Sequence, residues 1–203
     1  GSVVYFTDTQ QLTADASVNG PDLYRCEIAT LADGCSGLVD LTAPPSGSEE
    51  TTRALGVISG LSESGARVYF AAEGVLDAET DQLGQSPVPG RPNLYLWEEG
   101  RGLRFVASLA PGDTPDWGMN DFSNGAENSI LGAAASPSGR YFTFMSERDL
   151  TGNGTVDVSR DRQAEEIYRY DAEAETLVCV SCNPDGAAPQ GVTVRATNEL
   201  VNT

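Results

Sequence analysis

The chain repeats one pattern of apolar residues three times, and this repeat constrains its fold more than any other feature. The segments SVVYFTDTQQL, ARVYFAAEGVL and RYFTFMSERDL each contain a short run of aromatic and β-branched residues followed by a leucine. The matching residues are Phe6, Phe70 and Phe144, then Leu12, Leu76 and Leu150. A second strand-like segment follows each run, with a shared tyrosine at Tyr24, Tyr95 and Tyr168. This spacing predicts a structural unit that is repeated in series.

Each complete unit is predicted to hold four antiparallel strands. A further strand follows the tyrosine segment, as GLVDLT, GLRFVASLA and TLVCVSCN. In the second and third units an apolar strand also precedes a tight turn, Ser-Glu-Ser-Gly or Ser-Pro-Ser-Gly, in which glycine supplies the positive φ. The first unit lacks this inner strand. Residues 161–175 are expected to be strand rather than helix because the tyrosine pattern interrupts them. Four-stranded sheets in series predict the blades of an all-β propeller.

The Ser-x-Ser-Gly turn, followed by the I/L-Y-x-x-D/E strand, resembles the TolB-type (WD40-like) β-propeller repeat of bacterial extracytoplasmic proteins. The motif reads SPSGRYFTF with EIYRYD, SESGARVYF with NLYLWE, and DLYRCE with LVDLT. The resemblance covers about residues 3–182. It implies a propeller of four-stranded blades but little about function, because such repeats occur in scaffolds, in binding proteins and in propellers attached to peptidases.

We therefore expect a single propeller-like domain over residues 1–203, with blades at about 3–42, 54–110 and 129–182. Residues 183–203 are expected to begin a further blade or to supply a closing strand. Propellers typically have about four to eight blades, so three blades do not close a ring. The chain is expected to be part of a larger propeller or to be completed by oligomerisation.

Composition excludes several classes of function. The chain has no histidine, which excludes catalytic triads and metal sites that depend on that residue. Its net charge of −18 opposes binding to nucleic acid and to anionic membrane surfaces. No apolar run approaches the ~20 residues that a membrane-spanning helix needs. The sequence also contains no G-x-S-x-G motif for a serine nucleophile.

The four cysteines form two close pairs, Cys26 with Cys35 and Cys179 with Cys182. Local pairs of this kind predict disulfides and an extracytoplasmic location, whether secreted, periplasmic or at the cell surface. The first pair is expected to bridge a hairpin. The second pair has the spacing of a redox-active dithiol, but it ends a strand and meets an Asn-Pro-Asp-Gly turn. A structural disulfide is therefore the favoured interpretation, since redox-active pairs sit at a helix N-terminus.

One of three long loops has the composition of a calcium site. The loops span residues 73–92, 111–128 and 147–166. The third contains the candidate metal ligands Asp149, Asn153, Asp157 and Asp161, which offer the oxygen atoms that calcium prefers. The register of an EF-hand is absent, and the alternative is that these side chains cap turns in the loop. Turn capping is the favoured interpretation, and calcium is retained as a candidate cofactor.

The second long loop mixes acidic and aromatic side chains. Asp113, Asp116, Trp117, Asp121 and Phe122 are the candidate ligand-binding residues. Together they would form a platform for a sugar or a cationic group. The alternative, which we favour for the aromatic residues, is that they anchor the loop to the body of the protein.

The leading functional hypothesis is a non-catalytic extracytoplasmic module that binds or scaffolds a protein, peptide or glycan partner through its long acidic loops. The alternative is an enzyme, either a carboxylate- or calcium-dependent hydrolase or lyase, or the propeller domain of a larger peptidase. With 30 acidic residues, some carboxylate pair will lie at a catalytic spacing by chance, so the sequence assigns no catalytic residue.

Overall fold

Three antiparallel sheets follow one another along the chain, as the repeat predicts. The computed structural model describes residues 2–18, 20–28, 34–46, 51–113, 117, 132–154, 156–157 and 162–189. Sheet A contains β1 (Val3–Asp8), β2 (Asp22–Glu27) and β3 (Ser36–Asp40). Sheet B contains β4 (Arg53–Leu61), β5 (Arg67–Glu73), β6 (Pro92–Glu98) and β7 (Gly102–Ser108). Sheet C contains β8 (Ala134–Ala135), β9 (Tyr141–Ser146), β12 (Glu166–Asp171) and β13 (Thr176–Cys179). A 3-10 turn η1 (Pro111–Asp113) follows sheet B, and β10 (Val156–Asp157) pairs with β11 (Arg162–Gln163) as a separate ribbon.

The repeated phenylalanine and tyrosine are cross-strand partners in all three sheets. The paired residues are Phe6 and Tyr24, Phe70 and Tyr95, and Phe144 and Tyr168. Their ring centroids lie 5.6, 5.9 and 5.8 Å apart, with interplanar angles of 31°, 31° and 32°. The sequence rhythm therefore corresponds to one aromatic pair that has the same geometry in each sheet.

The hydroxyl of each of these tyrosines closes the loop that leaves the preceding strand. In sheet B, Tyr95 donates to the Gly74 carbonyl at 2.8 Å and accepts from the Leu76 amide at 3.1 Å. The same two bonds link Tyr24 to Gln10 and Leu12, and Tyr168 to Arg148 and Leu150. The repeated leucine thus marks the point at which the loop backbone is tied to the sheet.

The Ser-x-Ser-Gly segments form the predicted tight turns. Gly65 and Gly139 have φ values of +76° and +68°, a conformation that glycine adopts without steric cost. In each turn the first serine hydroxyl accepts a hydrogen bond from the amide that begins the next strand, at 3.0 Å in both turns. The strands on either side pair antiparallel, β4 with β5 and β8 with β9, as expected.

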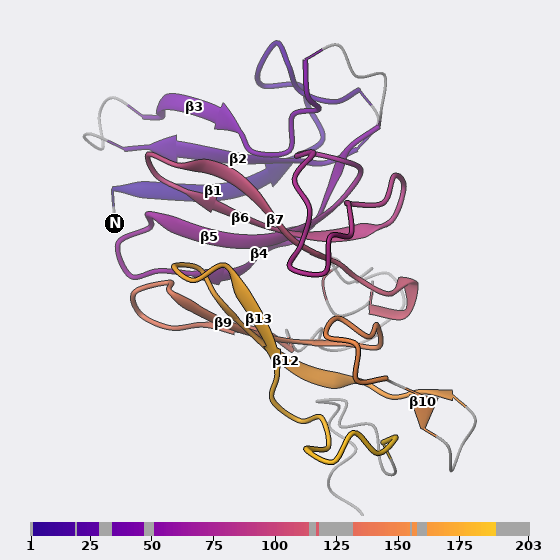
Figure 1. The fold of residues 1–203 in the computed structure, drawn as a ribbon. Coiled ribbons are helices and arrows are strands. Elements are labelled where there is room, and N and C mark those ends of the chain that lie inside the picture. The colour runs from indigo at the N-terminus through magenta and orange to yellow at the C-terminus, as the bar shows by residue number, and fades with distance from the viewer. Residues whose placement is uncertain are drawn as a thin grey trace, which may run out of the picture.

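The three sheets stack face to face, with sheet B in the middle (Figure 1). One face of sheet B packs on sheet A through residues such as Val68 and Phe70, and the other packs on sheet C through Tyr69 and Leu94. The Tyr69 ring stacks on Phe142 with centroids 4.2 Å apart. Apolar burial on both faces makes sheet B the centre of the core.

A second set of tyrosines links each sheet to the turn of the next sheet. The Tyr5 hydroxyl of sheet A donates to the Gly65 carbonyl at 2.6 Å, and the Tyr69 hydroxyl of sheet B donates to the Gly139 carbonyl at 2.7 Å. Thr143 occupies the corresponding position in sheet C, one residue before the repeated phenylalanine. The A–B and B–C interfaces therefore share this hydrogen bond. Sheet C has threonine instead of tyrosine at the matching position and cannot form it there.

Ion pairs join the sheets at the end that carries the tight turns. Glu98 is only 8% exposed and lies 2.7 Å from Arg67 and 2.7 Å from Arg104. Arg104 also pairs at 2.6 Å with Glu175, which belongs to the turn before β13. Charge pairing at this end of the stack therefore connects sheet B to sheet C.

Both predicted disulfides are present. Cys26 is bonded to Cys35 across the β2–β3 connection, and Cys179 is bonded to Cys182 just after β13. The expected strand within residues 161–175 is confirmed as β12.

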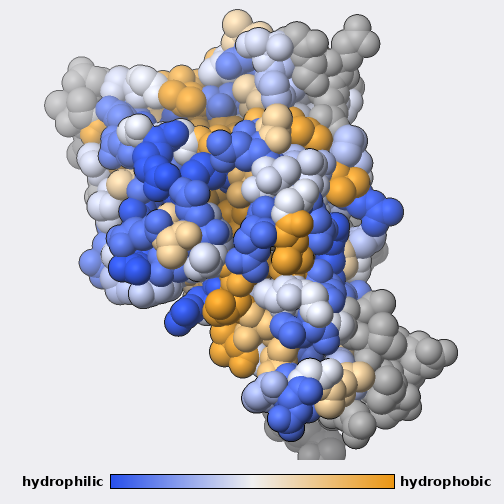
Figure 2. Space-filling model, in the orientation of Figure 1, coloured by the Kyte–Doolittle hydropathy of each residue, from blue (hydrophilic) through white to orange (hydrophobic). Residues whose placement is uncertain are grey.

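The described residues form an open stack of sheets and not a closed ring. Tyr141, Ile167 and Val178 on sheet C are 38%, 38% and 42% exposed. In the lower half of Figure 2, where Figure 1 places sheet C, apolar atoms reach the surface between hydrophilic ones. Residues 183–189 contain no strand, and residues 190–203, expected to begin a blade or close the ring, lie outside the described residues. No described helix has the length and apolar character needed to cross a membrane.

We expect Tyr95→Phe to lower the free energy of unfolding by about 1–3 kcal/mol, because it leaves the buried Leu76 amide without its acceptor. Urea unfolding would measure the loss. Tyr141→Phe is the matched control, since that ring is 38% exposed, and its effect should stay within about 0.5 kcal/mol. Equal stability of the two variants would contradict a structural role for the repeated hydroxyl.

Candidate functional site

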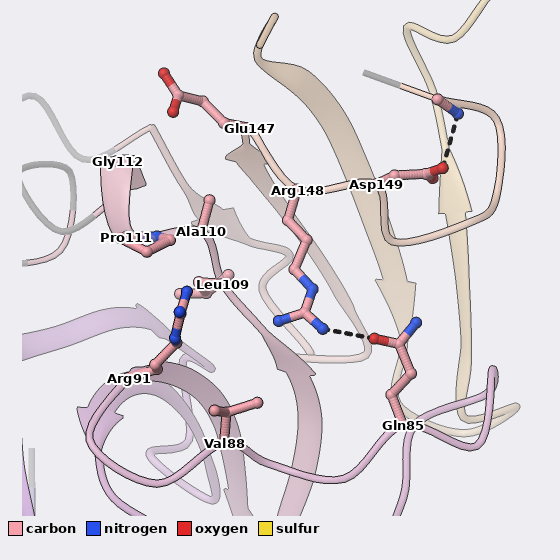
Figure 3. A pocket seen from close by; sticks show the side chains of 11 residues that line it. Gln85, Val88, Arg91, Leu109, Ala110, Pro111, Gly112, Glu147, Arg148 and Asp149 are labelled. Carbon is pink, nitrogen blue, oxygen red and sulfur yellow. Dashed lines mark hydrogen bonds between the residues drawn. The ribbon is translucent and has the colours of Figure 1, made fainter. Parts of the chain in front are cut away.

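The three long loops converge on one cleft between sheets B and C, named here the loop cleft. Its volume is about 880 Å³. The first loop contributes Gln85, Val88 and Arg91, and the third contributes Glu147, Arg148, Asp149 and Gly154. Leu109, Ala110, Pro111 and Gly112, at the end of β7 and the start of the second loop, form the wall between them (Figure 3). Segments far apart in the sequence thus meet at one end of the stack.

Asn93, a fully buried residue at the start of β6, fixes the first wall of the loop cleft. Its side-chain amide donates to the carbonyls of Gly74, Val88 and Arg91 at 3.0–3.1 Å, and its oxygen accepts from the Val88 amide at 3.0 Å. A single side chain therefore ties both ends of the loop together. Its bonds to Val88 and Arg91 hold the backbone of the first wall in one conformation.

Two glutamines of the first loop form hydrogen bonds to sheet C and to the loop that follows β9. The side-chain amide of Gln82 pairs with the backbone of Leu177 through two hydrogen bonds of 2.7 Å. Gln85 accepts a hydrogen bond of 2.6 Å from the guanidinium of Arg148 (Figure 3). These contacts place the two walls at a defined separation.

Two guanidinium groups enter the loop cleft from opposite walls (Figure 3). Arg91 is exposed, whereas Arg148 is half-buried. Six other described arginine side chains form ion pairs, namely Arg25, Arg53, Arg67, Arg101, Arg104 and Arg140. Neither Arg91 nor Arg148 has a carboxylate partner among the described residues. The loop cleft therefore contains two guanidinium groups that form no ion pair with a described residue, although the carboxylates of Glu147 and Asp149 also line it.

A buried carboxyl group bonds to the backbone of two residues that line the loop cleft. Asp113 is fully buried and accepts hydrogen bonds from the Ala110 amide at 2.9 Å, the Glu147 amide at 2.9 Å and the Ser146 hydroxyl at 2.5 Å. Burial raises the pKa of Asp113 to about 6, against the opposing effect of these hydrogen bonds. The side chain joins the end of sheet B to the strand end that carries Arg148.

The predicted calcium ligands are engaged otherwise where the structure describes them. Asp149 accepts four backbone N–H bonds, from Thr151, Gly152, Asn153 and Gly154, at 2.6–3.2 Å. These donors lower the pKa of the Asp149 carboxyl despite its partial burial. Three of these donors share Oδ1 and one bonds Oδ2, so the loop's own backbone engages both oxygens and the geometry favours turn capping over metal ligation.

Asn153, the next candidate ligand, donates through its side chain to the Thr151 hydroxyl at 2.8 Å. Asp157 lies in β10, but its side chain is outside the described part of the structure, as is all of Asp161. Asp157 and Asp161 therefore stay candidate calcium ligands on the sequence alone.

The candidate ligand platform is described at two of its five residues. Trp117 is 3% exposed and packs edge-on against Phe144, with centroids 6.0 Å apart. This contact and the burial of Asp113 favour the anchoring interpretation for both side chains. Asp116, Asp121 and Phe122 lie outside the described residues.

The loop-cleft arginines were not among the residues that the sequence analysis singled out. Each stands beside residues that attracted attention for other reasons, Arg91 before a proline that begins β6 and Arg148 between two acids. The one signal was the scarcity of cations: the chain has 12 arginines and 30 acidic residues, so an arginine without an acidic partner is unexpected. Which arginines lack an acidic partner depends on contacts between loops and is not encoded in local sequence.

A second pair of buried carboxyl groups lies in sheet A, away from the loop cleft. Asp22 and Asp40 are 0% and 8% exposed and are linked through Thr42. The Thr42 amide and hydroxyl donate to the same Asp40 oxygen at 2.8 and 2.9 Å. Burial raises the pKa of Asp40 to about 6 and also raises the pKa of Asp22.

No protein-family model and no curated protein matches the chain. Among solved structures, one similar chain is TolB from Acinetobacter baumannii, with 12% sequence identity and a TM-score of 0.37. The match covers 90% of this chain, which spans about 30% of the length of that structure. A TM-score this low does not assign the chain to the fold of that protein.

We expect Asp149→Asn to lower the free energy of unfolding by about 1–2 kcal/mol, because a neutral amide replaces a carboxylate that accepts four N–H bonds. Glu79→Gln, on an exposed part of the first loop, is the matched control. Because the Asp149 oxygens are already engaged, we also expect millimolar calcium to leave the melting temperature unchanged. A calcium-dependent rise that Asp149→Asn abolishes would establish calcium ligation instead.

We expect Asp40→Asn to stabilise the protein near neutral pH. A carboxyl whose pKa is raised to about 6 in the folded state favours folding while protonated, and this stability is lost as pH rises from about 4 to about 6. The amide oxygen can still accept from Thr42 and carries no charge. The variant should be about 1–2 kcal/mol more stable than the parent at pH 7 and equal to it near pH 4. Urea unfolding across this range provides the test, and a difference independent of pH would refute it.

Proposed function

We propose that this chain is a non-catalytic, extracytoplasmic binding module of the β-propeller type. Its recognition site is the loop cleft, and its partner is a protein or peptide that presents a carboxylate group. The strands are committed to packing between sheets, so recognition falls to the loops that connect them. The disulfides Cys26–Cys35 and Cys179–Cys182 support a location in an oxidising compartment.

The observation that carries this proposal is the pair of guanidinium groups of Arg91 and Arg148. Both line the loop cleft, and neither has a carboxylate partner among the described residues. Acidic residues outnumber arginines by 30 to 12, so an arginine is expected to have a carboxylate nearby. Six other described arginines do form such ion pairs. Two that do not, at the same opening, are arranged for a carboxylate supplied by a partner.

The net charge limits what the partner can be. A carboxylate accepts two parallel N–H bonds from one guanidinium, which gives the contact direction as well as strength. The protein as a whole carries a charge of −18 and repels polyanions at long range. A single carboxylate on a peptide of otherwise low charge fits both conditions better than a nucleic acid or a polyacidic chain does.

The states of Asp149 and Asp113 support binding rather than hydrolysis. A glycosidase of the paired-carboxylate type needs a general acid, whose pKa is raised so that it holds a proton near neutral pH. The pKa of Asp149 is lowered instead, and its oxygens are held by the loop backbone. Asp113, whose pKa is raised, is buried with its carboxylate bonded to the fold.

Fluorescence anisotropy with labelled, otherwise neutral peptide libraries tests this proposal. One pair of libraries ends in a free carboxylate or an amide, and another pair contains one internal Asp or Asn. We expect binding to require the carboxylate and to weaken about 10-fold or more in the Arg91→Gln, Arg148→Gln double variant. Arg91→Gln alone should also weaken binding, without breaking the contact between Arg148 and Gln85.

Arg169→Gln is the matched control. Arg169 also lacks a described carboxylate partner but stacks on Tyr141, 5.2 Å from the ring centroid, on the outer face of sheet C. It should bind like the parent. Equal binding of acid and amide libraries, or an equal loss in the Arg169 variant, would overturn the assignment of the loop cleft.

A further inference from the structure

A buried carboxylate lies beside the second disulfide. Glu166 begins β12, Cys179 ends β13, and Cys182 follows in the next turn. One Glu166 oxygen and the two sulfur atoms all lie within 4.8 Å of one another. A carboxylate and two sulfur atoms that would be thiolates after reduction, both ligand types used by zinc, are thus gathered at one end of sheet C.

The surroundings of Glu166 distinguish it from the other buried glutamate. Glu98, at 8% exposure, is surrounded by Arg67, Arg101 and Arg104. Glu166, at 6% exposure, has no arginine within ion-pair distance among the described residues, and its described partner is the Ser181 hydroxyl. A buried carboxylate without a described cationic partner is costly, and a metal ion would supply positive charge beside it.

We propose that reduction of the Cys179–Cys182 disulfide converts this corner of sheet C into a zinc-class metal site with Glu166 as the third ligand. A dithiol or phosphine reductant supplies two electrons, and the two sulfur atoms take up two protons. Binding of one divalent ion then releases those protons, leaving two thiolates and one carboxylate on the metal. Two cysteines separated by two residues have the spacing that chelates one ion.

The local structure allows both states. Cys179 and Cys182 are half-buried and Ser181 is exposed, so a reductant can reach the disulfide. The β12–β13 pairing, with Tyr168 opposite Cys179, is formed by the backbone and does not require the disulfide. While the disulfide is intact both sulfur atoms are occupied, so the site exists only in the reduced chain.

Cobalt(II), a spectroscopic substitute for zinc, tests this proposal on the full chain. After reduction with a phosphine, we expect one equivalent to bind with thiolate-to-cobalt charge-transfer absorption, and zinc to displace it. The oxidised chain should give no such absorption. A Cys179→Ala, Cys182→Ala variant should lose it, whereas a Cys26→Ala, Cys35→Ala variant should keep it.

Glu166→Gln tests the third ligand. We expect it to weaken cobalt binding by about 10–100-fold. Removing a group that only bonds to a metal ligand has an effect of this size, and losing a ligand should cost at least as much. Asp185→Asn, which removes an exposed acid three residues after Cys182, should bind like the parent. Melting of the oxidised variants establishes that both fold. Absence of charge-transfer absorption in the reduced parent, or equal affinities of the Glu166 and Asp185 variants, would overturn the proposal.

Discussion

One tyrosine hydroxyl per sheet, bonded to the backbone just beyond the preceding strand, is the interaction on which the rest of the structure depends. Tyr24, Tyr95 and Tyr168 each donate to one loop carbonyl and accept from one loop amide. Burial raises the pKa of the Tyr24 and Tyr168 hydroxyls, which keeps each protonated and able both to donate and to accept a hydrogen bond. Because every sheet uses the same contact at the same strand end, the long loops all begin at one end of the stack, and those of sheets B and C meet there.

The opposite end of the stack obeys a different constraint. There the turns must be tight enough for one sheet to approach the next, and glycine permits this. A side chain at Gly139 would lie 2.8 Å from the Cβ of Arg67 and 2.9 Å from that of Ser62. Close approach at the turns is accompanied by ion pairs around Glu98. The described residues thus have an end with tight turns and ion pairs and an opposite end from which the long loops leave.

Much of this fold follows from local patterns. Strand alternation, serine and glycine turns and the tyrosine rhythm all act within one unit, so every strand of sheet B was predictable from local sequence. The cross-strand pairing of each phenylalanine with its tyrosine emerged only from the structure. The cleft was harder to foresee because it depends on contacts such as Gln82 with Leu177, which are 95 residues apart. The aspartates that attracted attention, such as Asp149, are typical of loops that bond to their own backbone, so composition alone did not separate ligands from caps.

The two faces of each sheet are chemically different, and this gives the stack a direction. One face carries the phenylalanine–tyrosine pair, and the other carries Tyr5 or Tyr69, whose hydroxyl reaches the neighbouring turn. Contacts between such unlike faces are heterologous, so copies that joined through them would add head to tail. They would form a ring where the rotation between copies closes, or a growing fibre where it does not. Thr143 stands at the outer face of sheet C where sheets A and B have Tyr5 and Tyr69, so a copy added at that face would lack this hydrogen bond.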